Sequence, residues 1–133
     1  MGLKFFRPIL NVAGALFLSF SLILIGPVLS AQAEAPLGDY RCVGNNPGQK
    51  VPYKGHVHVE KNGQTYTVFW RFGATTYIGT GIDQGDAFAV IFTKPQSNGY
   101  GLILFRKNAK TGHWTGRWTQ PGSKTIGQEV WGK

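Results

Sequence analysis

Bulky apolar side chains alternate with polar ones along most of the chain beyond residue 37, in short runs that are separated by glycine-rich segments. An alternation of period two predicts β-strands that turn one face toward a core. Nowhere in this part of the chain do apolar residues recur at helical spacing over three uninterrupted turns. The pattern predicts eight strands, at residues 38–43, 55–61, 65–72, 75–82, 87–93, 99–107, 113–119 and 124–131.

The connections between these runs are short, which predicts antiparallel neighbours, because parallel strands need crossovers of a dozen or more residues. Asn62-Gly63 is typical of a tight hairpin turn. An open meander of eight strands would leave two unpaired edges and one exposed apolar face, and closure removes both. We therefore expect an all-β fold, an eight-stranded antiparallel meander closed as a small barrel. A two-sheet β-sandwich is the alternative.

Glycines and aromatic rings dominate the predicted strands. The strand glycines are expected to permit coiling of the strands and to make room for Trp and Tyr rings across the core; they are Gly79, Gly81, Gly101, Gly116 and Gly127. Trp70 and Trp118 each precede one of these glycines by nine residues, which indicates either chance or one hairpin geometry used twice.

Most of the aromatic rings are expected to form the core of the barrel. The residues concerned are Trp70, Trp114, Trp118, Trp131, Tyr66, Tyr77 and Tyr100. The alternative is that some of them line a pocket at the barrel mouth, where aromatic walls with a few polar groups suit an apolar or glycan ligand.

The first 33 residues have the order of a secretory signal peptide. Lys4 and Arg7 precede an uncharged, mostly apolar stretch, which ends near Gly26-Pro27 and is followed by Ala31-Gln32-Ala33. Small residues at positions 31 and 33 predict cleavage after Ala33. We expect residues 1–33 to be removed and residues 34–133 to form a single domain with no membrane span. An uncleaved membrane anchor is the alternative, because the apolar stretch is long enough to cross a bilayer.

The predicted mature domain is basic and has one cysteine. Only Lys4 and Arg7 of the 14 basic residues precede residue 34, which leaves 12 basic and 6 acidic residues and a net charge of +6. This charge favours anionic partners, but the basic residues are scattered, and nucleic acid is not expected as a partner. Cys42 has no second cysteine to pair with, and we expect it to be buried and inert rather than an intermolecular link.

The most suggestive pattern for chemistry is His56-Val57-His58-Val59-Glu60. Alternation places both imidazoles and the carboxylate on one strand face, where residues two apart lie about 6.6 Å from each other. His113 or another carboxylate would be needed to complete a metal site. The favoured interpretation is a polar outer face opposite Val57 and Val59, and no metal is assigned.

Catalytic groups are sparse in the predicted domain. Asp83 and Asp86 lie in a predicted turn, where aspartate bonds its own backbone, and no other pair of the six acidic residues is indicated. Ser97 and Ser123 lie in predicted loops without a nucleophile-elbow context, and a Cys42–histidine pair has no support. We therefore expect a protein that is not an enzyme and has no cofactor, and its ligand-binding residues stay open.

Several segments resemble small exported bacterial proteins that are described as fibronectin-binding. The likeness spans nearly all of residues 34–133 and includes DYRCVGNNPG (39–48), YKG (53–55), YTVFW (66–70), GTGI (79–82), AV (89–90) and WTGRW (114–118). The resemblance implies adhesion or envelope binding, and it carries no binding residue with it. A Tyr-x-Cys opening at Tyr40 is more weakly similar to periplasmic inhibitors of C-type lysozyme. The second cysteine and the Ser-Gly-x-x-Tyr segment of those inhibitors are missing, and their target is itself basic.

Export, a closed meander and the scarcity of catalytic groups together favour a non-enzymatic binding protein of the periplasm, the cell surface or the secreted fraction. The leading expectation is adhesion to a host extracellular-matrix glycoprotein. The alternative is a calycin-like or avidin-like barrel that carries a small apolar or aromatic ligand in the periplasm. A lysozyme-inhibitor-like envelope protein ranks third.

Overall fold

The computed structural model describes residues 34–133 of the chain. The predicted signal peptide, residues 1–33, lies outside the described residues. The strands are β1 (Gly38–Asn45), β2 (Pro52–Asn62), β3 (Thr65–Phe72), β4 (Thr75–Gln84), β5 (Ala87–Thr93), β6 (Tyr100–Lys107), β7 (Trp114–Thr119) and β8 (Gly127–Gly132).

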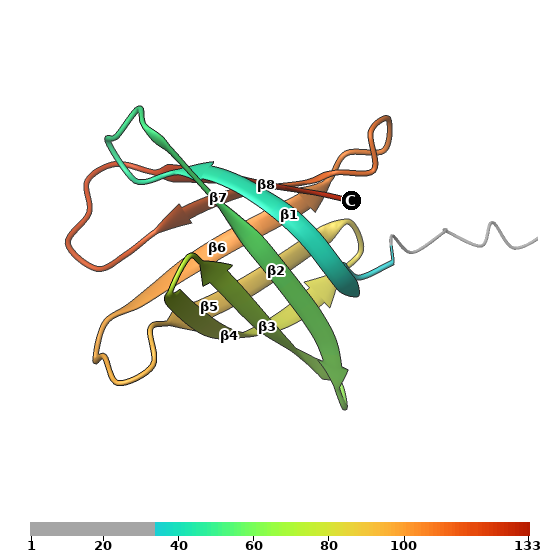
Figure 1. Ribbon diagram of the computed structural model, residues 1–133. Coiled ribbons are helices and arrows are strands. Elements are labelled where there is room, and N and C mark those ends of the chain that lie inside the picture. Colours follow the sequence, from blue (N-terminus) through green and yellow to red (C-terminus); the bar gives the residue numbers. More distant parts are fainter. Residues whose placement is uncertain (1–33) are drawn as a thin grey trace, which may run out of the picture. The chain divides into compact units, whose positions relative to one another are not determined.

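Each strand pairs antiparallel with the next one in the chain, and β8 pairs with β1 to close a barrel (Figure 1). The predicted all-β meander and its closure are thus confirmed, and the alternative sandwich is not adopted. Closure leaves no strand edge of the barrel without a neighbour. Residues 34–133 contain no helix of the length and apolar character that a bilayer crossing requires.

The predicted strand limits are least accurate where a loop is long. The last strand begins at Gly127 and not at residue 124, because β7 ends at Thr119 and the first pair across this hairpin is Trp118 with Gly127. Residues before Gly127 therefore have no ladder partner on β7, although their composition suits a strand. The first strand extends to Asn45, which pairs with both β2 and β8.

Three hairpins turn through two residues of which the first is glycine. Gly63, Gly73 and Gly85 have φ angles of 61°, 60° and 62°, and each is followed by one residue before the next strand. Glycine at the first of two loop residues is typical of a type II′ turn, whose twist matches that of the flanking strands. The predicted Asn62-Gly63 turn is shifted by one residue, because Asn62 still belongs to β2.

Successive strands of the meander run in opposite directions, so their connections lie alternately at the two ends of the barrel (Figure 1). The β1–β2, β3–β4, β5–β6 and β7–β8 connections meet at one end, which we call the loop end. The other three connections share the opposite end with the start of β1 and the end of β8, and we call it the terminal end. Pro36, which precedes β1, is fully buried, so the approach to β1 takes part in closing the terminal end.

The half of the barrel near the terminal end is filled with aromatic side chains. Trp131 packs against Phe105 with ring centroids 3.9 Å apart and against Phe88 at 6.4 Å. Phe105 can lie flat against the wall because it faces Gly116 on β7, where a Cβ would be only 2.5 Å from the Phe105 ring. The prediction that strand glycines make room for rings holds, but the rings are mostly Phe and come from adjacent strands.

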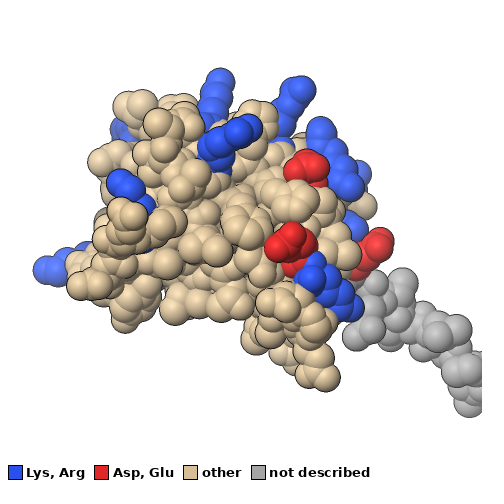
Figure 2. Space-filling model, turned by 60° about the horizontal axis from the view of Figure 1, so that its bottom comes forward, with Lys and Arg blue, Asp and Glu red and all other residues tan. Residues whose placement is uncertain are grey.

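The outer surface of the barrel differs between its two sides. On β1 and β2 the outward positions carry charged and imidazole side chains, including Asp39, His58 and Glu60. On β4, β5 and β6 they carry Ile82, Ile91 and exposed leucines instead. Figure 2 brings the lower side of Figure 1 forward and shows a broad uncharged area, with Lys and Arg side chains along much of its margin and Asp and Glu side chains at its right.

Candidate functional site

The half of the barrel near the loop end is hollow. It holds a cavity of about 770 Å³, which we call the cup. The residues that line the cup come from seven strands, β2 to β8, and the two loops at its rim: Asn46, Pro47, Gln49, Tyr53, Trp70, Phe72, Thr75, Tyr77, Phe92, Ile103, Trp118, Gln120, Pro121, Gly122, Ser123 and Glu129. A cavity of this size falls within the range of small-molecule sites in proteins.

Aromatic rings form a continuous wall around the cup. Tyr53 packs edge-on against Phe72, Phe72 against Tyr77, Tyr77 against Phe92, and Phe92 against Trp118. The four centroid distances lie between 5.0 and 6.1 Å and the interplanar angles between 69° and 79°. Edge-to-face packing is the favoured geometry of aromatic pairs, so each ring fixes the tilt of the next and the wall is preorganised.

The carboxyl group of Glu129 lies at the inner part of the cup, although the residue is only 4% exposed. Its Oε1 accepts hydrogen bonds from the indole N–H groups of Trp70, at 2.8 Å, and Trp131, at 2.5 Å. Its Oε2 accepts one from the Tyr53 hydroxyl at 2.6 Å. Strands β2, β3 and β8 thus converge on one carboxyl group in the barrel interior.

Burial raises the pKa of the Glu129 carboxyl above its usual value, and the hydrogen bonds from Tyr53, Trp131 and Trp70 act in the opposite direction. Burial and the nearby Glu129 charge raise the pKa of the Tyr53 hydroxyl, so Tyr53 stays protonated. They also raise the pKa of the Cys42 thiol. The Tyr53 hydroxyl and the Cys42 thiol therefore stay protonated, and Glu129 is the one carboxyl group of the inner cup.

Trp118 has the one buried side-chain polar atom without a hydrogen-bond partner among residues 34–133, its indole nitrogen. The nitrogen lies over Gly127, where any Cβ would overlap the indole ring. The nearby indole N–H acts to lower the pKa of the Tyr53 hydroxyl, against the larger effects of burial and Glu129. The two groups do not form a hydrogen bond. Gly127 therefore sets the position of Trp118 in the wall of the cup.

The repeated Trp–Gly spacing seen in the sequence does not reflect one geometry used twice. Trp118 pairs directly with Gly127 across its hairpin. Trp70 pairs with Tyr77, and Gly79 lies two residues further along β4. The difference follows from the connections, because β3 and β4 are joined by a two-residue turn and β7 and β8 by a longer loop.

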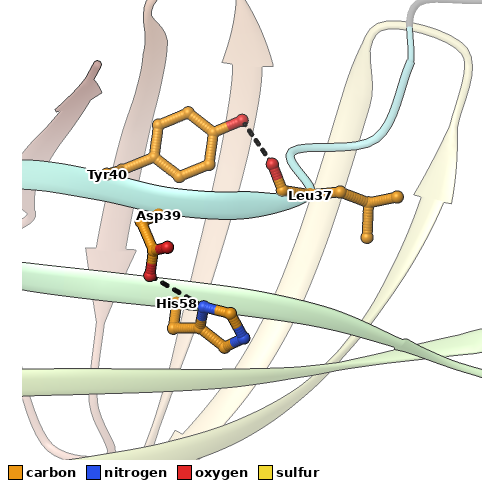
Figure 3. A network of polar contacts seen from close by, with 4 residues as sticks. All are labelled: Leu37, Asp39, Tyr40 and His58. Atoms are coloured by element: carbon orange, nitrogen blue, oxygen red, sulfur yellow. Dashed lines mark hydrogen bonds and ion pairs between the residues drawn. The ribbon is translucent and has the colours of Figure 1, made fainter.

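The histidine-rich segment of β2 lies on the outside of the barrel, as its favoured interpretation predicted. His56, His58 and Glu60 are all exposed. His58 Nδ1 lies 2.8 Å from Asp39 Oδ1 on β1 (Figure 3). No group of three His, Cys, Asp or Glu side chains able to hold a metal ion occurs within the described range.

The aromatic residues singled out in the sequence divide into three groups. Trp70, Trp114, Trp131 and Tyr66 are buried in the core, and Trp70 also reaches the cup. The second group, Trp118 and Tyr77, is partly buried and lines the cup. The third is Tyr100, which is 55% exposed and lies outside both the core and the cup, because Gly101 occupies the inward position at that end of β6.

The remaining candidate groups are separated from one another. Asp86 lies in the β4–β5 turn and accepts a hydrogen bond from Arg106, while Asp83 is exposed at the end of β4. Ser97 and Ser123 bond loop backbone atoms. Cys42 is a free cysteine and is 1% exposed, so its predicted burial is confirmed.

A smaller hollow of about 400 Å³ lies at the terminal end, between the approach to β1 and the β6–β7 connection. Its residues include Glu34, Tyr40, His113 and Lys133. The Tyr40 hydroxyl donates to the Leu37 carbonyl oxygen at 3.3 Å and so holds the chain before β1 across this end (Figure 3).

Sequence reasoning missed the two polar residues at the centre of the cup, Glu129 and Tyr53. The strand period of two places Glu129 on the same face as Trp131, one of the rings expected in the core. A carboxylate at an inward-facing position of the last strand could therefore have been predicted from the sequence. No local signal identifies Tyr53, because the predicted second strand began at residue 55. Its role follows from the extension of β2 to Pro52.

Comparisons with known proteins add no relative: no protein-family model matches the chain, and no curated protein matches it significantly.

Proposed function

We propose that this protein is an exported, non-enzymatic binding protein that holds a small ligand in the cup at the loop end of its barrel. The observation that carries the proposal is the hollow of about 770 Å³ beside a filled half of the same barrel. A barrel of eight strands is just wide enough for side chains to fill it or for one small ligand to enter. The cup is surrounded by packed aromatic rings and is open at the loop end, which suits the entry of one small ligand.

The polar groups of the cup support the same proposal. Small-molecule sites are mostly apolar and contain a few placed polar groups that orient the ligand. In the cup these groups are Glu129 and Tyr53 at the inner part and the amides of Asn46, Gln49 and Gln120 nearer the rim. Export is supported by the signal-peptide pattern of residues 1–33, and the site would then lie in the periplasm, on the cell surface or in the secreted fraction.

The test uses two variants at neighbouring positions on β4. Thr75→Trp places an indole in the cup, because Thr75 lines it, whereas Thr76→Trp places the same group on the exposed outer face. Protein purified from its own host is measured by native mass spectrometry. We expect extra non-covalent mass on the wild type and on Thr76→Trp, and none on Thr75→Trp.

The proposal fails if the wild type carries no extra mass and if a library of small metabolites shifts the melting temperatures of Thr75→Trp and Thr76→Trp equally. Circular dichroism before the measurement shows whether each variant has the β-sheet content of the wild type.

Adhesion to an extracellular-matrix glycoprotein is the second candidate, and the uncharged outer side of the barrel favours it. Ile82, Ile91, Leu102 and Leu104 are between 46% and 61% exposed, and they lie on three adjacent strands. Arg117 is opposite Leu104 on β7 and so flanks this side. A large exposed apolar patch with a polar rim is typical of a protein interface, and the flanking Arg117 suits an acidic glycoprotein.

This candidate is tested by retention on immobilised matrix glycoproteins. Replacing Ile91 and Leu102 together by Ser is expected to abolish retention, while Val43→Ser, at an exposed position on β1, leaves it intact. Equal retention of both variants, or retention that disappears at modestly higher salt, would show plain charge attraction.

A further inference from the structure

The cup is lined by a single carboxyl group and by no basic side chain, so the charge that its lining can supply is negative. Of the residues that line the cup, none is Lys, Arg or His, and Glu129 is the one carboxylate. This is unexpected in a domain whose described residues include 12 basic and 6 acidic side chains. The basic residues lie elsewhere, so no positive side chain lines the cup.

The three partners of Glu129 stabilise a carboxylate without neutralising it. Indole N–H groups are donors only, and the Tyr53 hydroxyl remains protonated, so none of them supplies a formal positive charge. Buried charges in proteins are normally paired or bound to a cation. Among residues 34–133 no salt bridge involves Glu129.

The carboxyl group also keeps one position open. Each carboxylate oxygen can accept about two hydrogen bonds. Oε1 accepts from both Trp70 and Trp131, but Oε2 accepts from Tyr53 alone. Tyr53 and Glu129 both line the cup, so a ligand that reaches its inner part can approach the less occupied oxygen.

The walls of the cup provide the second element of a cation site. Aromatic faces are negative and attract cations placed over them. The edge-to-face chain from Tyr53 through Phe72, Tyr77 and Phe92 to Trp118 directs neighbouring rings at steep angles to one another. Rings set at steep angles around a single space form a box, in which a compact cation contacts more than one ring.

We infer that the ligand of the cup is a small organic cation, a substituted ammonium whose charge faces Glu129 and whose alkyl groups contact the aromatic wall. This inference rests on the proposed function and names the chemical class of its ligand. The shared chemistry is an ammonium group with apolar substituents. A free small molecule and the headgroup of a lipid both provide it, and the experiment below tests both.

The test compares two molecules that differ in charge and hardly in shape. Choline has a quaternary nitrogen, and 3,3-dimethyl-1-butanol has a neutral carbon at the same place. Calorimetric titration of the wild type is expected to give at least about tenfold tighter binding for choline, a difference of about 1.4 kcal/mol. Vesicles of phosphatidylcholine, titrated against vesicles of phosphatidylglycerol, show whether the group is also bound within a lipid surface.

Two carboxylate-to-amide variants complete the design, because both raise the net charge by one. Glu129→Gln is expected to lower the affinity for choline to that for the alcohol. Glu60→Gln removes a carboxylate from the exposed outer face of β2 and is expected to bind choline as the wild type does. Retained tryptophan emission and β-sheet circular dichroism show that Glu129→Gln is folded.

Equal affinities for choline and the alcohol, or equal losses in the two Gln variants, would overturn the cation inference. The proposed function would survive either result if native mass spectrometry still found a neutral or acidic molecule bound to the wild type and absent from Thr75→Trp. Absence of any ligand there, with equal behaviour of Thr75→Trp and Thr76→Trp, would instead remove the proposed function itself.

Discussion

Trp70 and Glu129 are 59 positions apart in the chain and meet inside the barrel, where the indole N–H donates a 2.8 Å hydrogen bond to Oε1. The contact joins β3 to β8 across the interior, and Trp131 bonds the same oxygen from β8 itself. The carboxyl group therefore marks the boundary between the filled and the hollow halves of the barrel.

Replacing Glu129 by Leu is expected to destabilise the protein far more than replacing it by Gln. Leu has a similar size but accepts no hydrogen bond, which strands two buried indole N–H groups at about 1–3 kcal/mol each. The amide oxygen of Gln accepts from both indoles, and its NH₂ can donate to Tyr53. We expect a loss of about 2–5 kcal/mol for Leu and less than about 1 kcal/mol for Gln in urea denaturation, and equal losses would contradict the network.

The stability of the wild type is expected to fall as the pH rises above about 4.5, the ordinary pKa of this carboxyl. The folded state raises the pKa of Glu129, so above the unfolded value it holds a proton that the unfolded chain has released. The loss ends once the pH passes the folded pKa. The other titratable groups facing Glu129 are Tyr53 and Cys42, and both stay protonated in this range.

The measurement is urea denaturation of the wild type and Glu129→Gln at a series of pH values. The difference in free energy of unfolding between the two proteins, plotted against pH, reports the Glu129 proton. The slope of this plot is at most about 1.4 kcal/mol per pH unit. A difference that stays constant between pH 4 and 8 would show that the carboxyl has the same pKa in both states.

Trp70→Phe is expected to cost about 1–2 kcal/mol more than Trp118→Phe. Both changes remove a similar piece of an aromatic ring, but the indole N–H of Trp70 binds Glu129 and that of Trp118 has no partner. A hydrogen bond contributes about 0.5–1.5 kcal/mol to stability, and more where one partner is ionised.

The control for this pair is the Glu129→Leu background, in which Trp70 has lost its acceptor. There the two Phe substitutions are expected to differ by less than in the wild type, as a double-mutant cycle would show. If the two Phe substitutions differed in stability by the same amount in both backgrounds, the difference would come from packing around Trp70 and not from its hydrogen bond.

Cys42 is expected not to react with a thiol reagent such as Ellman's reagent in the folded protein, and to react fully in denaturant. The thiol is 1% exposed, and burial raises its pKa, which lowers the amount of reactive thiolate. Rapid labelling without denaturant, or a dimer that disappears on reduction, would show that β1 opens or that the thiol is accessible.

The strand pattern was predictable because alternation and turn chemistry are local. Val57, Val68 and Val90 each occupy the inward phase of their run, and all three are buried. Turn glycines such as Gly73 and Gly85 mark the hairpins, since positive φ is available to glycine at little cost. Short connections between eight such runs then leave few arrangements other than a closed meander.

The candidate site was much less predictable, because its residues come together only through closure. Tyr53 precedes the predicted limit of its strand, and Glu129 stands next to Trp131 in phase without any indication of its partner on β3. The sequence could suggest that some rings line a pocket, but it could not tell Trp114, which is buried in the filled half, from Trp118, which lines the cup.

The sequence by itself determined the strands, their turns and which side chains point inward, because these depend on period two and on glycine at tight turns. Only the tertiary structure decided that the terminal half is filled and the loop half hollow, and that a carboxylate lies between them. The physical reason is that inward-facing side chains fill or leave space according to the register between strands that are distant in sequence. Whether Trp70 can reach Glu129 is settled only when β8 closes against β1.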